Sequence, residues 1–344
     1  MSLRERLISR IVETGPMSVA DYMTACLHDP REGYYATRPR LGASGDFITA
    51  PHVSQMFGEL LGLWAVEAWT RLGRPERFRL VELGPGDGAM MADMLRAARL
   101  APEFLSAAEV WLVETSDPLK AAQARSLAGL KVRWAGGLED LPADAPAIIL
   151  ANEFLDCLPI RQYVVARGAR LERRIGLDAS QALMFTVPAL SPLEARAGRI
   201  HEGSCALTAF GATVGAMVAR TGGVALFIDY GRDAPGSGDT LQALRDHQKE
   251  SPLAHPGAAD LTAHVDFPSF VEAARGAGAE APPLVSQGDF LRRLGIAERA
   301  AVLTRANPDM AETIARQCHR LIAPDAMGAL FKVARIHHKG FDVP

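Results

Sequence analysis

Phe78-Arg-Leu-Val-Glu-Leu-Gly-Pro-Gly-Asp-Gly-Ala-Met-Met91 is the stretch that decides the fold. Its apolar residues Leu80, Val81 and Leu83 predict a short buried strand, and the alternating glycines after them predict a tight turn. From residue 89 to residue 99 the apolar side chains recur at helical spacing. A strand, a glycine turn and a helix in this order are typical of the first nucleotide site of a doubly wound α/β sheet.

The acids of this stretch indicate which ligand the turn takes. Gly84, Gly86 and Ala89 satisfy the Gly-x-Gly-x-x-Gly/Ala pattern of dinucleotide sites only permissively. Asp87 would put a carboxylate beside a pyrophosphate, where a helix N-terminus attracts anions, and Glu82 adds a second negative charge. A ligand with a cationic centre and no phosphate is more compatible, and S-adenosylmethionine has a sulfonium and an ammonium group. We therefore expect the turn to bind S-adenosylmethionine through Glu82, Gly84, Pro85, Gly86, Asp87 and Gly88. On this stretch alone, a turn that merely joins a strand to a helix stays an alternative.

The next two strands bring further candidates to the same site. Residues 110–114 predict a strand that ends in Glu114, and an acid at this point can bind ribose hydroxyls, although an isolated acid there is as often only solvated. Residues 131–134 predict a third strand. The loop after it borders the adenine in such folds, so Gly136, Gly137 and Leu138 are weaker cofactor candidates.

The fourth and fifth strands supply the candidate acceptor side of the site. Residues 146–151 form a continuous apolar run, typical of a parallel strand that is buried on both faces. The strand delivers Asn152, Glu153 and Asp156 to the carboxyl edge of the sheet, where ligands bind. The alternative is that Asn152 caps a helix whose first turn carries the two acids. The fifth strand, residues 224–231, carries Asp229 near its carboxyl end.

Composition excludes several classes of partner. The chain has 344 residues and a net charge of −3, so its overall charge does not favour nucleic acid or anionic lipid. No apolar run approaches the roughly 20 residues that span a bilayer, and the N-terminal residues lack the apolar core of a secretory signal. The four cysteines have no C-x-x-C spacing and the nine histidines no metal-ligand pattern. We expect a cytoplasmic protein without a metal site.

A series of motifs along nearly the whole chain resembles the MidA-like family, which includes the mitochondrial arginine methyltransferase that assists assembly of respiratory complex I. The motifs are Gly15-Pro-Met-Ser18, His28-Asp-Pro-x-x-Gly-Tyr-Tyr35, Gly45-Asp-Phe-Ile-Thr49, Gln55-Met-Phe-Gly-Glu59, Val81-Glu-Leu-Gly-Pro-Gly-Asp-Gly88, Asn152-Glu-Phe-Leu-Asp-x-Leu-Pro159, Ile228-Asp-Tyr-Gly231 and Met327-Gly-x-Leu-Phe-Lys-Val333. The resemblance implies a class I methyltransferase fold that uses S-adenosylmethionine. It also implies a protein arginine acceptor on a complex I subunit. Cys157 departs from it mildly, because relatives often have a small residue there.

The expected architecture follows from these motifs. Residues 1–77 would form an N-terminal helical extension and lid, and residues 78–344 the doubly wound, Rossmann-like methyltransferase domain with an insertion after strand four at about 160–205. We hypothesise that residues 45–49, with Asp46, fold over the cofactor as part of the lid.

The chemistry of an arginine acceptor names the candidate catalytic residues. Guanidinium stays protonated at neutral pH, with a pKa above about 12, so carboxylates that grip it can orient one nitrogen and take up charge as its proton leaves. Glu153 and Asp156 are the candidates for this grip, with Asp229 behind them. Two other functions remain open: a small-molecule methyltransferase and a non-catalytic assembly factor that binds the cofactor. The sequence leaves the acceptor, the degree of methylation and the oligomeric state open, with a homodimer among the alternatives.

Overall fold

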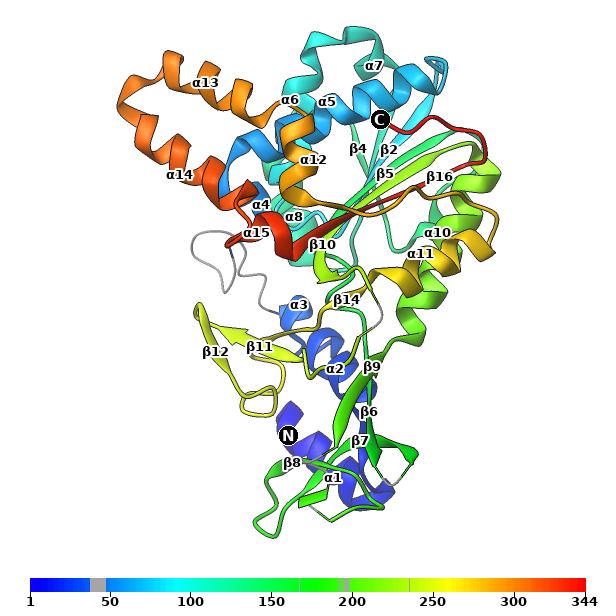
Figure 1. Cartoon of the computed structure of the whole chain (residues 1–344), viewed down its shortest axis with the longest axis vertical. Helices are drawn as coiled ribbons and strands as arrows, with labels where there is room; N and C mark the ends of the chain where they lie inside the picture. Colours follow the sequence, from blue (N-terminus) through cyan, green and yellow to red (C-terminus); the bar gives the residue numbers. More distant parts are fainter. Residues whose placement is uncertain (38–47, 167, 192, 195–197, 235) are drawn as a thin grey trace.

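The structure, a computed structural model, describes residues 1–37, 48–166, 168–191, 193–194, 198–234 and 236–344. A larger lobe is built on a long twisted sheet, and a smaller lobe lies beyond the carboxyl edge of that sheet (Figure 1). In the described part of the chain, no helix combines the length and the apolar character that a membrane crossing requires.

The central sheet is a doubly wound α/β sheet, as the sequence predicts. Its strand order is β15 (Val285–Ser286), β16 (Phe331–His337), β10 (Val224–Arg232), β5 (Ala147–Asn152), β2 (Phe78–Leu83), β3 (Ala108–Val113) and β4 (Val132–Ala135). Only β16 runs antiparallel to its neighbours, and the short β14 (Val265–Asp266) pairs with the end of β10. The chain winds outward from β2 in one direction and from β5 in the other. The boundary between β2 and β5 is therefore the switch point, where open α/β sheets bind ligands.

Helices cover both faces of the central sheet (Figure 1). One face packs against α5 (Gln55–Arg71), α6 (Ala89–Ala97), α12 (Gln287–Arg293), α13 (Ile296–Ala306) and α14 (Ala311–Ile322). The other packs against α10 (Cys205–Thr221) and α11 (Phe267–Gly276). The remaining helices of this lobe are α4 (Ala50–Val53), α7 (Pro102–Ala107), α8 (Asp117–Ser126) and α15 (Met327–Leu330).

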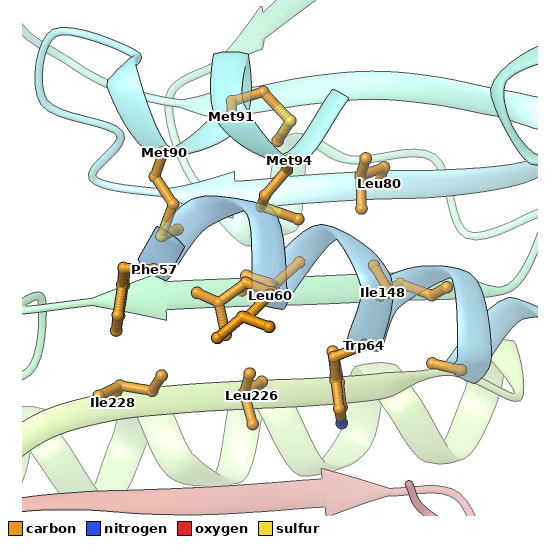
Figure 2. Packing of buried hydrophobic residues seen from close by; sticks show 14 of the residues in the cluster. Phe57, Leu60, Trp64, Leu80, Met90, Met91, Met94, Ile148, Leu226 and Ile228 are labelled. Atoms are coloured by element: carbon orange, nitrogen blue, oxygen red, sulfur yellow. The ribbon is translucent and has the colours of Figure 1, made fainter. Parts of the chain in front are cut away.

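Helix α5 holds the core together on its face of the sheet. Figure 2 shows Phe57, Leu60 and Trp64 of α5 beside Leu226 and Ile228 of β10. Complete burial of a side chain such as Phe57 contributes about 1.5–3 kcal/mol. This packing fixes β2 and β5, and with them the two loops at the switch point.

The smaller lobe has its own core, made from three separate parts of the chain. Residues 1–37 supply α1 (Leu3–Thr14), β1 (Met17–Ser18), α2 (Val19–His28) and α3 (Tyr34–Thr37). The insertion supplies β6 (Arg161–Ala166), β7 (Ala169–Leu177), β8 (Leu183–Thr186) and β9 (Arg199–Gly203), while a three-stranded sheet comes from β11 (Gln242–Arg245), β12 (Gln248–Glu250) and β13 (Asp260–Thr262). Leu7, Tyr22, Ile175 and Leu261 meet in this core.

Two short elements of the N-terminal region, Tyr34–Thr37 and Ala50–Val53, are single helical turns. Neither turn has a periodic apolar pattern long enough to predict a helix, and both are stabilised by contacts with distant segments. The division of the chain at residue 78 stays a prediction; in the observed packing, residues 1–37 belong to the smaller lobe and α5 to the larger one.

Candidate active site

A cavity of about 420 Å³ lies at the switch point, between the carboxyl edge of the central sheet and the smaller lobe. The predicted residues that line it are Glu82, Gly84, Pro85, Gly86, Asp87, Glu114, Gly136, Gly137, Leu138, Asn152, Glu153 and Asp156. Gly88 and Asp229 do not line it, and Asp46 lies outside the described residues. The cavity falls at the small end of the range of about 300–1,000 Å³ that is typical of small-molecule sites.

The turn after β2 needs its glycines for conformation. Gly84, Gly86 and Gly88 have φ values of 59°, 57° and 86°, in the left-handed region that other residues rarely adopt. A Cβ on Gly84 would lie 2.9 Å from Cδ2 of Phe154. Gly88 precedes α6 as its N-cap, so its part is to begin the helix while Gly84 and Gly86 face the cavity.

Glu82 is a buried carboxylate with an unused acceptor. Its side chain lines the cavity although the residue is only 2% exposed, and its Oε2 has no hydrogen-bond partner among the described residues. Burial, together with the charge of Asp87, raises the pKa of Glu82 well above its usual range. A cationic group of a ligand would supply the missing partner, so this residue fits S-adenosylmethionine.

Glu114 is fixed at the end of β3 by its own turn. Its Oε1 accepts hydrogen bonds from the backbone N–H groups of Thr115 and Ser116 at 2.8 and 2.7 Å. Burial raises the pKa of Glu114, although these donors oppose the shift. The carboxylate is therefore oriented before a ligand arrives.

Gln123 on α8 joins the turn after β2 to the end of β3, and sequence reasoning missed it. Its Nε2 donates to the backbone oxygen of Gly86 at 2.8 Å and to Oε2 of Glu114 at 3.3 Å, while its Oε1 accepts from Nε1 of Trp134. The residue is completely buried. A single amide thus sets the spacing between the glycine turn and the acid of β3.

His52 on α4 contacts the acid of the glycine turn, and this residue was also missed. Its Nε2 lies 2.9 Å from Oδ2 of Asp87 and its Nδ1 lies 2.9 Å from Oγ1 of Thr49. The hydrogen bond to Asp87 raises the pKa of His52 despite its partial burial. Burial by itself would raise the pKa of Asp87, but the contact with His52 and the N–H of Ala89 lower it. The two groups form a hydrogen-bonded pair at the edge of the cavity.

Glu153 and Asp156 both line the cavity after the end of β5. Oε1 of Glu153 accepts from the backbone N–H of Ala50 at 3.2 Å and from Nδ2 of Asn152 at 3.1 Å. Oδ2 of Asp156 accepts from the hydroxyl of Tyr230 at 2.5 Å. Burial and the charge of Asp156 raise the pKa of Glu153 to about 7. Burial likewise raises that of Asp156 to about 6, against the hydrogen bond from Tyr230.

Asp229 organises the loop that carries these two acids. Its Oδ2 accepts from the backbone N–H groups of Phe154, Leu155 and Asp156 at 3.1, 2.9 and 3.2 Å, and its Oδ1 accepts from that of Tyr230. The residue is 0% exposed, and burial raises its pKa, reinforced by the charges of Asp156 and Glu153. Asp229 therefore reaches the cavity only through the backbone that it holds.

The cavity is strongly acidic. Seven carboxylate residues line it, and its described lining contains no lysine or arginine; the seven are Glu82, Asp87, Glu114, Glu139, Glu153, Asp156 and Asp260. A buried acid elsewhere in the chain, Glu59, is instead neutralised by Arg96 and Arg299. A cavity lined by this many acids is suited to cationic ligands. Within the described residues, no group of three or more His, Cys, Asp or Glu side chains is arranged to hold a metal ion.

The fold and the acidic switch-point cavity define the class of protein, and comparison with known families agrees. Residues 60–284 match the family model described as "Putative S-adenosyl-L-methionine-dependent methyltransferase". The structure superposes with a TM-score of 0.85 on the crystal structure of a Burkholderia thailandensis protein bound to S-adenosyl-homocysteine, at 29% identity over 99% of this chain and 92% of that one. The protein is an enzyme, an S-adenosylmethionine-dependent methyltransferase.

Two curated relatives show to which methyltransferase family the chain belongs. The mouse protein named protein arginine methyltransferase NDUFAF7, mitochondrial, is 36% identical over 94% of this chain and 82% of its own length. The zebrafish protein of that name is 34% identical over 96% of this chain and 86% of its own. The chain belongs to the family of these proteins, as the MidA-like motifs indicate.

Proposed function

We propose that this methyltransferase transfers a methyl group to the guanidinium of an arginine in a protein substrate. The observation that carries the proposal is the pair Glu153 and Asp156, one half-buried acid and one buried acid. Among the described residues, the side chains and backbone groups that donate to their carboxylates are neutral: a backbone amide, a side-chain amide and a hydroxyl. Neutral donors orient a carboxylate and leave its charge available to a cation. The names of the curated relatives support the same acceptor.

The size of the cavity supports a side chain as the acceptor. A cavity of about 420 Å³ that also takes the cofactor leaves room for an inserted side chain and little room for a second large molecule. A small-molecule acceptor, the alternative class, would have to be compact and cationic to satisfy the same acids.

On the cofactor side, we assign S-adenosylmethionine to the turn and loops described above. Its methyl group is activated by the positive sulfonium to which it is attached. Glu82 would pair with the ammonium, Glu114 would bind the ribose hydroxyls, and residues 136–138 would border the adenine. Gly84 and Gly86 allow the close approach, and Asn152 would contribute from the end of β5.

On the acceptor side, Glu153 and Asp156 would grip the guanidinium and aim one nitrogen at the methyl group. Most of the catalysis in such a displacement is alignment. As the new N–CH₃ bond forms, the bond between the sulfonium sulfur and the methyl group would break and leave neutral S-adenosylhomocysteine. The nitrogen would lose one proton, and Glu153 would accept it. A carboxylate whose pKa is raised to about 7 can hold that proton at neutral pH. Asp229 would act as a positioning residue through the amides of residues 154–156.

A labelling experiment tests the acceptor. The protein is incubated with S-adenosylmethionine carrying a tritiated methyl group and with a lysate of source cells in which the gene is deleted. We expect a labelled protein band whose acid hydrolysate contains methylarginine. A labelled extractable small molecule would overturn the protein acceptor, and absence of incorporation with intact S-adenosylhomocysteine binding would favour a non-catalytic assembly factor.

Identification of the labelled band extends the proposal. From the family resemblance we propose a subunit of respiratory complex I as the substrate. Mass spectrometry of the band should identify such a subunit, and a labelled protein unrelated to complex I would contradict this part alone.

A further inference from the structure

The smaller lobe forms one wall of the cavity, and the function proposed above leaves this wall unexplained. His28, Tyr34 and Tyr35 line it. The rings of Tyr34 and Tyr35 meet edge to face, with centroids 5.3 Å apart and planes at 79°, and the His28 ring lies 5.9 Å from that of Tyr35. All three belong to the motif His28-Asp-Pro-x-x-Gly-Tyr-Tyr35.

The turn inside this motif fixes the backbone that carries the rings. The N–H of Gly33 donates to the backbone oxygen of Asp29 at 2.7 Å, and a Cβ on Gly33 would lie 2.5 Å from the backbone nitrogen of Asp29. Oδ1 of Asp29 accepts from the backbone of Arg31 and Glu32, and its Oδ2 pairs with Arg6 at 2.7 Å. Glycine is required at position 33 because its backbone touches that of Asp29. The turn therefore holds the backbone of Tyr34 and Tyr35 in one position.

The ring of Tyr35 is itself held in place beside the acceptor acids. Its hydroxyl donates to Oδ1 of Asp260 on β13 at 2.9 Å. Burial raises the pKa of Tyr35 well above its usual range, and the charges of Asp260 and Asp156 add to the shift. Tyr35, Asp156 and Asp260 line the same cavity.

We propose that the wall of Tyr34 and Tyr35 makes this site selective for arginine over lysine, with the acceptor guanidinium stacked on the Tyr35 ring while Glu153 and Asp156 hold its N–H groups. The inference rests on the proposed function and adds the basis of acceptor selection. A guanidinium is planar, weakly hydrated and able to stack on an aromatic face while its edge forms paired hydrogen bonds. An ammonium group is compact and strongly hydrated, so it gains less from the ring. Asp260 acts as a positioning residue for Tyr35.

Peptide binding to the full-length protein saturated with S-adenosylhomocysteine tests the wall. The probes are acetyl-Gly-Arg-Gly-amide and acetyl-Gly-Lys-Gly-amide, titrated by calorimetry. Tyr35→Leu should weaken binding of the arginine peptide by about 5- to 30-fold, the range of a buried cation–π contact, and change binding of the lysine peptide by less than about twofold. Tyr35→Phe, which keeps the ring, should retain most of the selectivity.

Two further variants distinguish loss of stacking from loss of peptide binding through misfolding. Tyr35→Met replaces the ring with a flexible apolar side chain that has no π face, and it should lose selectivity as Tyr35→Leu does. It provides the same test if the leucine variant fails to fold. Tyr163→Leu removes a half-buried tyrosine of β6 that lies outside the cavity, and it should leave both peptides unaffected. Unchanged affinity for S-adenosylhomocysteine establishes that each variant is folded.

The outcomes separate this inference from the function on which it rests. Wild-type selectivity in Tyr35→Leu or Tyr35→Met, or an equal loss in Tyr35→Phe, overturns the stacking. If either result is found while the lysate assay still yields methylarginine, the stacking on Tyr35 is rejected and the arginine acceptor stands. Failure of the wild type to bind the arginine peptide, together with no methylarginine in the lysate, overturns both.

Discussion

At the residue scale, Glu153 combines backbone strain with a perturbed charge. Its φ is 51°, in the left-handed region that a residue with a Cβ adopts only at a cost of about 1–3 kcal/mol. The backbone is held there by its N–H, which donates to Ile228 on the neighbouring strand, and by the amides that Asp229 binds just after it. The strained turn aims the carboxylate into the cavity instead of along the strand.

The pH dependence of the reaction follows from the acceptor acids. Both acids have raised pKa values, about 7 for Glu153 and about 6 for Asp156, so each is protonated below these values and ionised above them. A guanidinium binds the ionised forms. We expect kcat/KM to be highest above pH 7 and to fall as pH decreases through 7 and 6, measured as a pH–rate profile.

The variant Glu153→Gln serves as the matched test of that profile. This variant should lower kcat by about 10²-fold or more, because the proton acceptor is lost. The decrease of kcat/KM near pH 7 should disappear from its pH–rate profile, while the decrease near pH 6 remains. Glu67→Gln, an exposed residue of α5 paired with Arg71, is the control and should behave as the wild type. A profile with the same limb near pH 7 in Glu153→Gln would contradict the assignment.

At the scale of elements, the site depends on how helices join loops from different strands. Gln123 on helix α8 contacts both the turn after β2 and the end of β3. On helix α4, His52 contacts Asp87, and the backbone N–H of Ala50 donates to Glu153. Helix α4 therefore contacts both the cofactor turn and the acceptor acid. Neither helix offers a sequence motif for this role.

Gln123 gives an element-scale prediction about the cofactor. Gln123→Ala should weaken binding of S-adenosylhomocysteine by about 5- to 30-fold, because lost hydrogen bonds free the glycine turn and leave buried partners unsatisfied at about 1–2 kcal/mol. Isothermal titration calorimetry measures the change. Gln287→Ala is the control: this residue is also completely buried, but it donates to the Leu321 oxygen far from the cavity, so stability should fall without a change in affinity. Equal affinities in wild type and Gln123→Ala would refute the role.

At the scale of the whole molecule, the cavity exists because two lobes meet. The central sheet supplies the glycine turn after β2 and the acids Glu153 and Asp156, and the smaller lobe supplies His28, Tyr34 and Tyr35. That lobe closes around a core from three distant parts of the chain, and Tyr22 of α2 donates to the backbone oxygen of Pro252 within it.

The shared core predicts that damage at the N-terminus spreads to the insertion. Met23→Ala, at a completely buried position of α2, should cost about 2–5 kcal/mol of stability and raise hydrogen exchange in residues 160–166 and 241–263 as well as in α1. Urea unfolding and hydrogen exchange measure the two effects. Met310→Ala, half exposed after α13, should change stability by less than about 0.5 kcal/mol. Faster exchange confined to residues 1–37 would mean that the three parts are independent.

The sequence by itself determined the central sheet and which of its acids and glycines come to one edge of it. The glycine turn at 84–88, the apolar strands and the acids at their ends are local patterns, because conformation and strand burial depend on neighbouring residues. Parallel strands then bring their carboxyl ends to one edge, so Glu82, Glu114 and Glu153 could be assigned to one site without knowledge of any contact.

Only the tertiary structure decided which distant groups complete that site. His52 is 35 residues from Asp87, Gln123 is 37 residues from Gly86, and Tyr35 is 225 residues from Asp260. The distant partner of each residue cannot be read from its local sequence, because the contact depends on packing between elements that sequence periodicity cannot orient. The same reason explains Asp229, whose strand-end position is readable while its binding of backbone amides, rather than of a ligand, is decided by the neighbouring loop.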